Sequence, residues 1–322
     1  MAFVAVRDVN HYVEWVSRNP EHSENRHSSL PELSPQSNST LGQPNPGKPV
    51  MVFLHGWGGS ARYWKQTAEH LSDRFDCLLY DLRGFGRSPL PRPIPPSVES
   101  LGYELEGYAD DLNELLTHLG LKKVSINSHS TGASIAVLFL NRYPHYVDSA
   151  ILTCHGIFKY QAIAFKAFHF VGKYVVQFRP DWLATIPGVD RLFMSRFLQR
   201  PINAQDRREF LDDFLMADYE AALGTIYTSV SKHAAEIMPE EFKALTTPTL
   251  LISGECDQII PVRLGKSAAD LNPLVHHHVM AQTGHFPMLE DEPVYYQVID
   301  QFLQDCQIKR SPVANNLPGS IS

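Results

Sequence analysis

The sequence has few of the features that mark disulfide-rich, membrane-spanning or zinc-binding proteins. Its four cysteines lie far apart and form no C-x-x-C pair, which excludes a disulfide framework and a zinc knuckle. The longest apolar-rich stretch, residues 162–178, is interrupted by Lys166, His169 and Lys173, so we do not expect it to span a membrane. The first sixteen residues carry charges and no uninterrupted apolar core, unlike a signal peptide. We therefore expect a soluble, cytoplasmic protein.

Basic charge is also scarce in this chain. The 28 Lys and Arg residues are outnumbered by 35 Asp and Glu residues, which gives a formal net charge of -7. Because neutralising phosphates requires clustered basic charge, we do not expect a nucleic-acid partner. The 322 residues are 43% hydrophobic and 20% charged, which excludes a wholly disordered chain and a coiled coil. This length is sufficient for one large domain with a sizeable core.

Short apolar runs alternate with helical stretches over most of the chain. This alternation predicts an α/β fold with a mostly parallel sheet flanked by helices, into which a helical cap is inserted. We expect strands at 50–54, 75–80, 124–127, 149–153, 249–253 and 276–280, and helices at 61–72, 108–119, 132–142, 262–270 and 294–306.

The periodicity also divides the chain into segments. Residues 1–16 are expected to form an N-terminal hairpin with strands at 3–7 and 11–16, and the Ser- and Pro-rich residues 17–48 a mobile loop. The α/β core is expected at 49–156 and 246–306, the helical cap at 157–245, and a flexible tail at 307–322.

The residues able to carry chemistry follow the ends of the predicted strands, where ligands gather in such sheets. Strand 50–54 is followed by His55-Gly56-Trp57-Gly58-Gly59, and strand 124–127 by Ser128-His129-Ser130-Thr131-Gly132. The last two strands are followed by Gly254-Glu255-Cys256-Asp257 and by Gly284-His285-Phe286-Pro287. These motifs supply a serine, an aspartate and a histidine in that order along the chain.

In these motifs the sequence resembles the α/β-hydrolase superfamily, in its serine esterase and lipase-like branch. The resemblance implies that Ser130 is the nucleophile and His285 its base, with Asp257 holding the imidazole. Glu255 is the alternative acid. The backbone amide of Thr131 starts a helix and can donate to an oxyanion, and the resemblance implies the amide of Trp57 as the second donor.

One residue departs from the G-x-S-x-G pattern of the family, because Ser128 occupies the position of the first glycine. Serine is small enough to be tolerated at this sharp turn. It also makes Ser128 a second candidate nucleophile, but Gly132 behind Ser130 favours Ser130. A serine rather than an aspartate at this position does not favour the epoxide hydrolase and haloalkane dehalogenase branches.

Further residues are candidates for the substrate pocket. They are His55, Gly58, His129, His155, Trp182 and Phe286. His129 and His155 are equally well interpreted as core histidines. The run His276-His277-His278 does not favour a metal site, because alternate residues of a strand point to opposite faces. We expect neither a metal ion nor another cofactor.

The predicted cap has a charge of opposite sign to the rest of the chain. Residues 157–208 contain nine Lys or Arg residues against three Asp, interleaved with aromatic residues. Lys159, Lys166 and Lys173 recur every seven residues and would share one face of a helix. The preferred interpretation is that these lysines face solvent while the aromatics pack on the core domain. The alternative is a lid that contacts an anionic membrane surface peripherally and delivers a lipid-like ester.

The function that we predict is hydrolysis of a carboxylic ester with an apolar or lipid-like part. An acyltransferase, a C–C bond hydrolase or a cofactor-free perhydrolase would use the same three residues. A non-catalytic ligand-binding receptor on this fold is the alternative from a different class, since fold does not fix function. The sequence specifies neither the natural substrate nor the oligomeric state.

Overall fold

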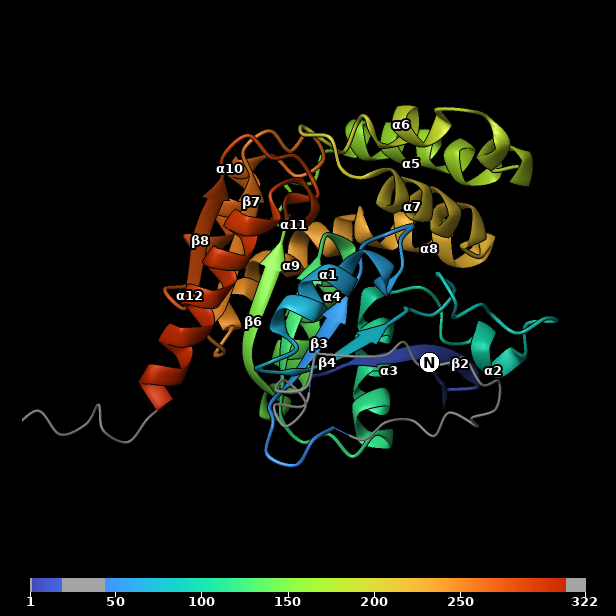
Figure 1. The fold of residues 1–322 in the computed structure, drawn as a ribbon. Helices are drawn as coiled ribbons and strands as arrows, with labels where there is room; N and C mark the ends of the chain where they lie inside the picture. The colour runs from blue at the N-terminus through green and yellow to red at the C-terminus, as the bar shows by residue number, and fades with distance from the viewer. Residues whose placement is uncertain (1, 19–43, 311–322) are drawn as a thin grey trace, which may run out of the picture.

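A computed structural model describes residues 2–18 and 44–310 of the chain (Figure 1). Eight strands form one sheet in the order β1-β2-β4-β3-β5-β6-β7-β8. The strands are β1 (Ala2–Val6), β2 (Val9–Val16), β3 (Val50–Leu54), β4 (Asp76–Tyr80), β5 (Val124–His129), β6 (Val147–Thr153), β7 (Thr249–Gly254) and β8 (Val275–Met280). From β4 to β8 every pairing is parallel, while β2 pairs antiparallel with both β1 and β4. The predicted fold class is confirmed.

The first two strands are joined by a turn of two residues. Arg7 and Asp8 both have positive φ, at 48° and 64°, which is the conformation of the tight hairpin turns that match strand twist. The turn therefore lies one residue earlier than we predicted. Most of the predicted loop 17–48, residues 19–43, lies outside the described residues.

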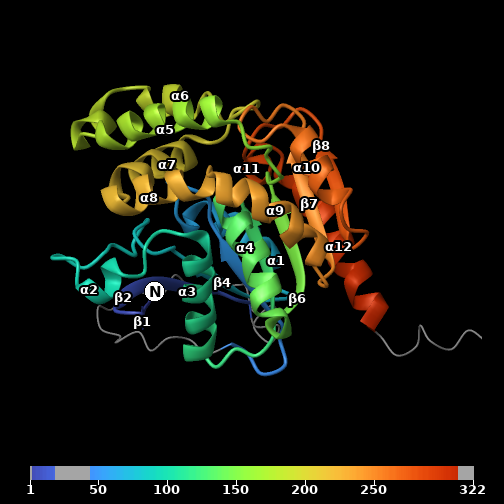
Figure 2. The same ribbon diagram turned by 180° about the vertical axis from the view of Figure 1, so that it is seen from behind.

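Both faces of the sheet are covered, so β3 is buried along its whole length. Alternate residues of β3 enter two separate hydrophobic clusters, with Val52 on one side and Phe53 on the other. The first cluster includes helices α3 (Leu105–His118) and α4 (Thr131–Arg142), and the second includes α1 (Lys65–Leu71) and α12 (Glu292–Arg310) (Figures 1 and 2).

The remaining core elements are short. They are the 3₁₀ turns η2 (Ala61–Trp64) and η3 (Pro144–Tyr146), and the helices α2 (Pro96–Glu99), α10 (Val262–Ala269) and α11 (Pro287–Glu290).

The C-terminal helix α12 is longer than predicted and ends at Arg310. The predicted tail 307–322 is therefore wrong for its first four residues. The helix continues because no glycine or proline, which would end it, occurs among Gln307, Ile308, Lys309 and Arg310. Residues 311–322 lie outside the described residues.

All elements between β6 and β7 are helical. They are α5 (Ala162–Gln177), the 3₁₀ turn η4 (Asp181–Thr185), α6 (Val189–Met194), α7 (Ala204–Met216), α8 (Tyr219–Ser229) and α9 (Lys232–Ala244). The helices α5 and α6 form the layer farthest from the sheet, above α7 and α8 (Figures 1 and 2). None of the helices in the described part of the chain is both long and apolar enough to cross a membrane.

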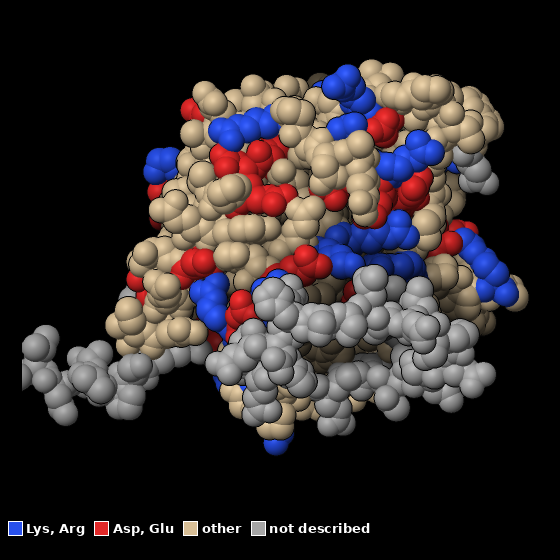
Figure 3. Space-filling view, in the orientation of Figure 1, with Lys and Arg blue, Asp and Glu red and all other residues tan. Residues whose placement is uncertain are grey.

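The aromatic residues of α5 and the turn after it do not pack as we expected. Phe168, Phe170, Tyr174 and Phe178 are all exposed, so the interpretation that they pack on the core domain is wrong for these four. Side chains without charge predominate along the top of Figure 3, where the cap lies, with isolated Lys and Arg among them.

Candidate active site

Ser130 occupies a sharp turn between β5 and α4. Its φ of 53° and ψ of -119° lie in a region that non-glycine residues rarely adopt, so the turn is strained and lifts the side chain out of the strand. Gly132, on the first turn of α4, packs against the end of β3. A Cβ atom at Gly132 would lie 2.4 Å from the carbonyl oxygen of His55, so only glycine fits.

Ser128 is accommodated as a buried, hydrogen-bonded residue. Its side chain is fully buried, and its hydroxyl donates a hydrogen bond of 3.0 Å to the carbonyl oxygen of Ile151 on the neighbouring strand β6. The hydroxyl thus has a structural partner, and a polar side chain at this buried position is satisfied.

Three of the predicted side chains form one hydrogen-bonded series. His285 Nε2 lies 3.0 Å from Ser130 Oγ, and His285 Nδ1 lies 2.7 Å from Asp257 Oδ2. The side chains of His285 and Asp257 are almost completely buried. A hydroxyl, an imidazole and a carboxylate in this order can activate the hydroxyl as a nucleophile and stabilise the imidazolium that results.

The carboxylate of Asp257 is itself held in place. Its Oδ1 accepts hydrogen bonds from the backbone N–H groups of Ile259 and Ile260, at 2.7 and 2.9 Å. The alternative acid, Glu255, is exposed and accepts a hydrogen bond from the N–H of Gln282 instead. The geometry therefore assigns the contact with His285 to Asp257.

The predicted oxyanion donors come from two elements, helix α4 and the turn after β3. Thr131 is the first residue of α4, so its N–H belongs to the helical turn that has no intrahelical acceptor. Trp57 lies in the turn after β3, and its indole N–H donates a hydrogen bond of 2.9 Å to Ala222 on cap helix α8. Gly58, with a φ of 72°, comes close to the ring of Phe214.

His55 holds this turn from beneath. Its Nε2 accepts a hydrogen bond from the N–H of Leu82, and its Nδ1 donates to the carbonyl oxygen of Gly56. Burial lowers the pKa of His55, so the ring is neutral and both nitrogens are satisfied. We predicted His55 in the substrate pocket, but its fully buried ring supports the backbone instead.

His129 lies beneath His285. Its Nε2 is 2.7 Å from the carbonyl oxygen of His285, and its Nδ1 is 3.1 Å from the hydroxyl of Tyr63. Burial lowers the pKa of His129 well below its ordinary value, which keeps the ring neutral. This histidine connects elements of the site and is not open to a substrate.

His155 lies away from this series. Burial lowers its pKa to about 4, and its ring stacks on Phe242. It borders a cavity of about 20 Å³ that is also lined by Phe158 and Phe165. Such a volume holds about one water molecule, so this cavity is too small for a substrate.

An aromatic cluster surrounds His285. Phe286 is fully buried and packs against Tyr63, His129 and Phe210, with ring centroids 5.6, 4.7 and 5.0 Å away. Phe197 lies 6.2 Å from the ring of His285, and Phe193 and Phe214 extend the cluster into the cap. Trp182 is 60% exposed on η4, which places it on the surface of the cap rather than in this cluster.

One further buried carboxylate connects the cap to the loop of His285. Glu290 accepts hydrogen bonds from the backbone N–H groups of Gly284 and Phe286 on this loop. It also accepts from the N–H groups of Gln199 and Arg200 in the cap, at 2.7 and 2.8 Å. The carboxylate therefore fixes the backbone on both sides of His285.

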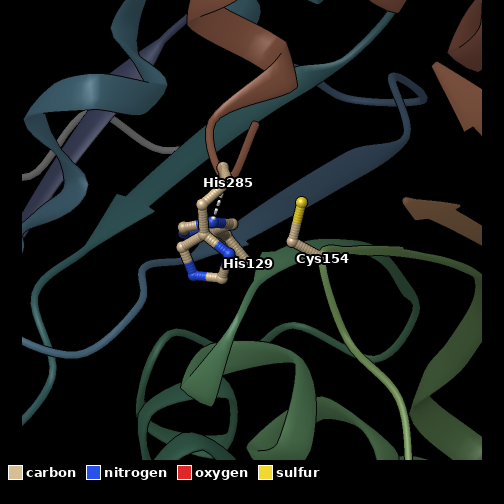
Figure 4. Close-up of side chains that lie close together, drawn as sticks. All are labelled: His129, Cys154 and His285. Carbon is tan, nitrogen blue, oxygen red and sulfur yellow. Dashed lines mark hydrogen bonds between the residues drawn. The ribbon is translucent and has the colours of Figure 1, made fainter. Parts of the chain in front are cut away.

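His129, Cys154 and His285 are close enough for their donor atoms to share a metal ion, since these atoms lie within 4.8 Å of one another (Figure 4). Both nitrogens of each histidine already have hydrogen-bond partners. Burial raises the pKa of the Cys154 thiol well above its ordinary value, whereas a metal ligand must be a thiolate. We therefore interpret the cluster as packing around the catalytic candidates.

Tyr63, Phe210, Phe214 and Glu290 were not among the predicted site residues. Tyr63 and the two phenylalanines are indistinguishable in the sequence from core aromatics on helices. The signal that could have identified Glu290 is its position five residues after His285 and three residues after the end of the Gly-His-Phe-Pro motif.

Comparison with known proteins identifies the family of the chain. The family model described as the alpha/beta hydrolase fold matches residues 49–292. The uncharacterized hydrolase YugF of Bacillus subtilis is 24% identical over 267 residues, which cover 81% of this chain and 92% of that protein. Epoxide hydrolase 3 of Mus musculus is 25% identical over 272 residues, covering 80% and 71%.

A solved structure of similar fold is an esterase from Exiguobacterium antarcticum. It matches with a TM-score of 0.70 and 18% identity, and the match covers 94% of this chain and 99% of that one. The chain therefore belongs to the alpha/beta hydrolase fold family, and it is a hydrolase of this fold.

Proposed function

We propose that the protein is a serine hydrolase that cleaves a carboxylic ester through an acyl-enzyme. The observation that carries this proposal is the series from Ser130 through His285 to Asp257, with distances of 3.0 and 2.7 Å. No part of this series requires a metal ion or another cofactor.

The proposed reaction gives each group one role. Ser130 Oγ attacks the carbonyl carbon of the ester while His285 Nε2 takes its proton, and the N–H groups of Trp57 and Thr131 donate to the oxyanion. His285 then gives the proton to the leaving alcohol. In the second half, His285 takes a proton from water, the hydroxide attacks the acyl carbon, and the acid leaves as Ser130 regains its proton.

The aromatic cluster favours an apolar acyl or alcohol part in the substrate. Phe197 lies beside His285, and Phe193 and Phe214 continue the apolar lining into the cap. Several proteins of similar fold bear the name esterase, including the one from Exiguobacterium antarcticum. The activity in the name of epoxide hydrolase 3 is not transferred, because the nucleophile position here holds a serine and not an aspartate.

The test is labelling with a fluorophosphonate probe, read by mass spectrometry, together with hydrolysis of nitrophenyl esters. We expect the label on Ser130, and a loss of about 10³-fold or more in kcat for Ser130→Ala. Asp257→Asn should lower kcat by about 10⁴-fold, because the imidazole then adopts the wrong tautomer.

Ser128→Ala is the matched control, since it removes the neighbouring hydroxyl and should leave the label in place. A label on Ser128, or full activity in Ser130→Ala, would contradict the proposal. Adding an alcohol acceptor to the assay separates acyl transfer from hydrolysis: an acyl-alcohol product exceeding the free acid would identify an acyltransferase.

A further inference from the structure

Helix α5 of the cap has one face that packs against the protein. Phe165, Gly172 and Val176 are buried on this face, which lies against α8. His169 shares the face and hydrogen-bonds the carbonyl oxygen of Val230 at 2.7 Å. These four residues are spaced by three or four, so they form one stripe along the helix.

The opposite side of α5 is exposed and apolar. Successive residues of a helix are rotated by about 100° around the helix axis. Six exposed apolar residues of α5 therefore fall within an arc of roughly 160° opposite the packed stripe. They are Ile163, Phe168, Phe170, Val171, Tyr174 and Val175, and we call them the outer face of α5. Ile163 is 87% exposed and Phe170 is 63% exposed, although a soluble helix normally presents charged residues here.

The charged residues of the segment that carries the outer face have a single sign. Lys166 and Lys173 are exposed on one flank of α5, between the outer face and the packed stripe, and Lys159 precedes the helix. Residues 157–180 contain no Asp or Glu. The surface is therefore apolar with a basic border, which is the composition of helices that lie in a membrane interface.

More exposed apolar residues follow α5 along the chain. Trp182 and Leu192 are 60% and 75% exposed, and Arg191 is exposed beside Leu192. Leu192 belongs to α6, which lies in the cap layer farthest from the sheet (Figures 1 and 2). Over half of the exposed large hydrophobic residues of the described chain fall between 160 and 192. Such a concentration marks an interaction surface.

We propose that the outer face of α5 docks the protein on an anionic lipid membrane. The apolar side chains would enter the boundary between headgroups and acyl chains, and Lys166 and Lys173 would contact the negatively charged headgroups. A second copy of the chain docked through the same face fits less well, because residues 157–180 offer no acidic partner for its lysines. The membrane would then also supply the ester substrate, which rests on the proposed function, whereas the docking does not.

The first experiment measures binding by vesicle sedimentation. The full-length Ser130→Ala variant is used so that the vesicles are not hydrolysed. We compare vesicles of phosphatidylcholine with vesicles that also contain phosphatidylserine. Binding should be stronger to the anionic vesicles and should weaken as salt is added, since salt screens the lysines. Equal binding to both vesicle types, or no binding to either, would overturn the proposal.

Variants assign the binding to this surface. Lys166→Gln combined with Lys173→Gln should weaken partition onto anionic vesicles by roughly tenfold or more. Lys243→Gln combined with Lys266→Gln is the matched control, since it removes the same charge from exposed lysines elsewhere and should have no effect. If the Lys166 and Lys173 variant binds anionic vesicles as strongly as its parent, the vesicles do not bind through this surface.

Substituting the apolar side chains separates a membrane from a second copy. Phe170→Ser combined with Tyr174→Ser should abolish vesicle binding while the protein sediments as before in the absence of lipid. If this variant instead converts a dimer into a monomer and binds vesicles as well as its parent, the face is a dimer interface and the proposal is wrong.

Activity distinguishes this inference from the proposed function. With Ser130 present, the surface variants should hydrolyse a short water-soluble nitrophenyl ester at the wild-type rate. They should hydrolyse a long-chain ester embedded in anionic vesicles at least several-fold more slowly. A wild-type protein that binds vesicles but hydrolyses neither ester would refute the proposed function and leave the docking intact.

Discussion

His129 Nε2 lies 2.7 Å from the carbonyl oxygen of His285, and this contact determines the direction of a chain of hydrogen bonds beneath the site. A carbonyl oxygen only accepts, so Nε2 carries the hydrogen. Because burial keeps the ring neutral, Nδ1 must accept, and the hydroxyl of Tyr63 must donate to it. The oxygen of Tyr63 in turn accepts from the N–H of Gly56. The turn after β3 and the backbone of His285 are thus connected through two buried side chains.

We expect Tyr63→Phe to impair catalysis through this chain. The substitution leaves the N–H of Gly56 and the Nδ1 of His129 without their partner, which costs about 1–3 kcal/mol for each buried group that stays unsatisfied. Because the turn after β3 and the position of His285 both loosen, kcat should fall by roughly tenfold or more while KM changes little. Steady-state kinetics with a nitrophenyl ester would measure kcat and KM separately.

Tyr80→Phe is the matched control for this prediction. The hydroxyl of Tyr80 is buried and finds no hydrogen-bond partner among the described residues, so removing it should leave kcat unchanged and stability unchanged or higher. Equal kinetics for Tyr63→Phe and Tyr80→Phe would refute the role of Tyr63.

Glu290→Gln should lower activity by releasing the backbone around His285. The carboxylate accepts from four backbone N–H groups, whereas an amide offers one acceptor oxygen and turns an NH₂ group toward the remaining donors. Hydrogen bonds to a charged acceptor are the stronger kind, so we expect a fall of roughly tenfold or more in the rate of fluorophosphonate labelling.

Glu255→Gln provides the comparison for Glu290, because Glu255 also accepts a backbone N–H but is exposed. It should retain the wild-type labelling rate. If Glu290→Gln lowers the melting temperature but labels Ser130 as fast as wild type, the carboxylate stabilises the fold without positioning His285.

The sequence predicts the catalytic candidates well because they depend on the sheet. Ser130, Asp257 and His285 each follow a parallel strand, and the carboxyl ends of parallel strands meet at one edge. Alternation of strands and helices is therefore sufficient to bring the three residues together, although Ser130 and His285 are more than 150 positions apart in the chain.

The surroundings of these residues depend on tertiary packing that periodicity does not encode. The sequence of α5 is apolar on nearly every side, so nothing in it distinguishes the stripe of Phe165 and Gly172 from the outer face with Phe170. Tertiary contacts select the packed side, among them the close approach of Ile226 to Gly172 and the hydrogen bond of His169 to Val230. In the same way, Phe210 and Phe214 reach the site because α7 crosses above it.

Asp213 on cap helix α7 is a buried acid at the contact between cap and core. Its Oδ2 accepts a hydrogen bond of 2.6 Å from Ser60, and the guanidinium of Arg62 lies 3.3 Å from Oδ1. The pKa of Asp213 is raised to about 7, chiefly by burial and to a smaller extent by nearby Asp81. Arg62, Ser60 and Arg87 offset only part of this rise.

A raised pKa in the folded protein makes stability depend on pH with a definite sign. Between pH 4 and 7 the folded protein binds a proton at Asp213 that the unfolded chain has released, so stability falls as pH rises, by up to about 4 kcal/mol. Asp213→Asn cannot ionise and should lack this fall, so its melting temperature relative to wild type should rise between pH 5 and pH 8. Asp212→Asn, on the partly exposed neighbouring residue, should show no such trend. A constant difference between Asp213→Asn and wild type across this range would mean that Asp213 is ionised throughout, with Arg62 compensating its burial.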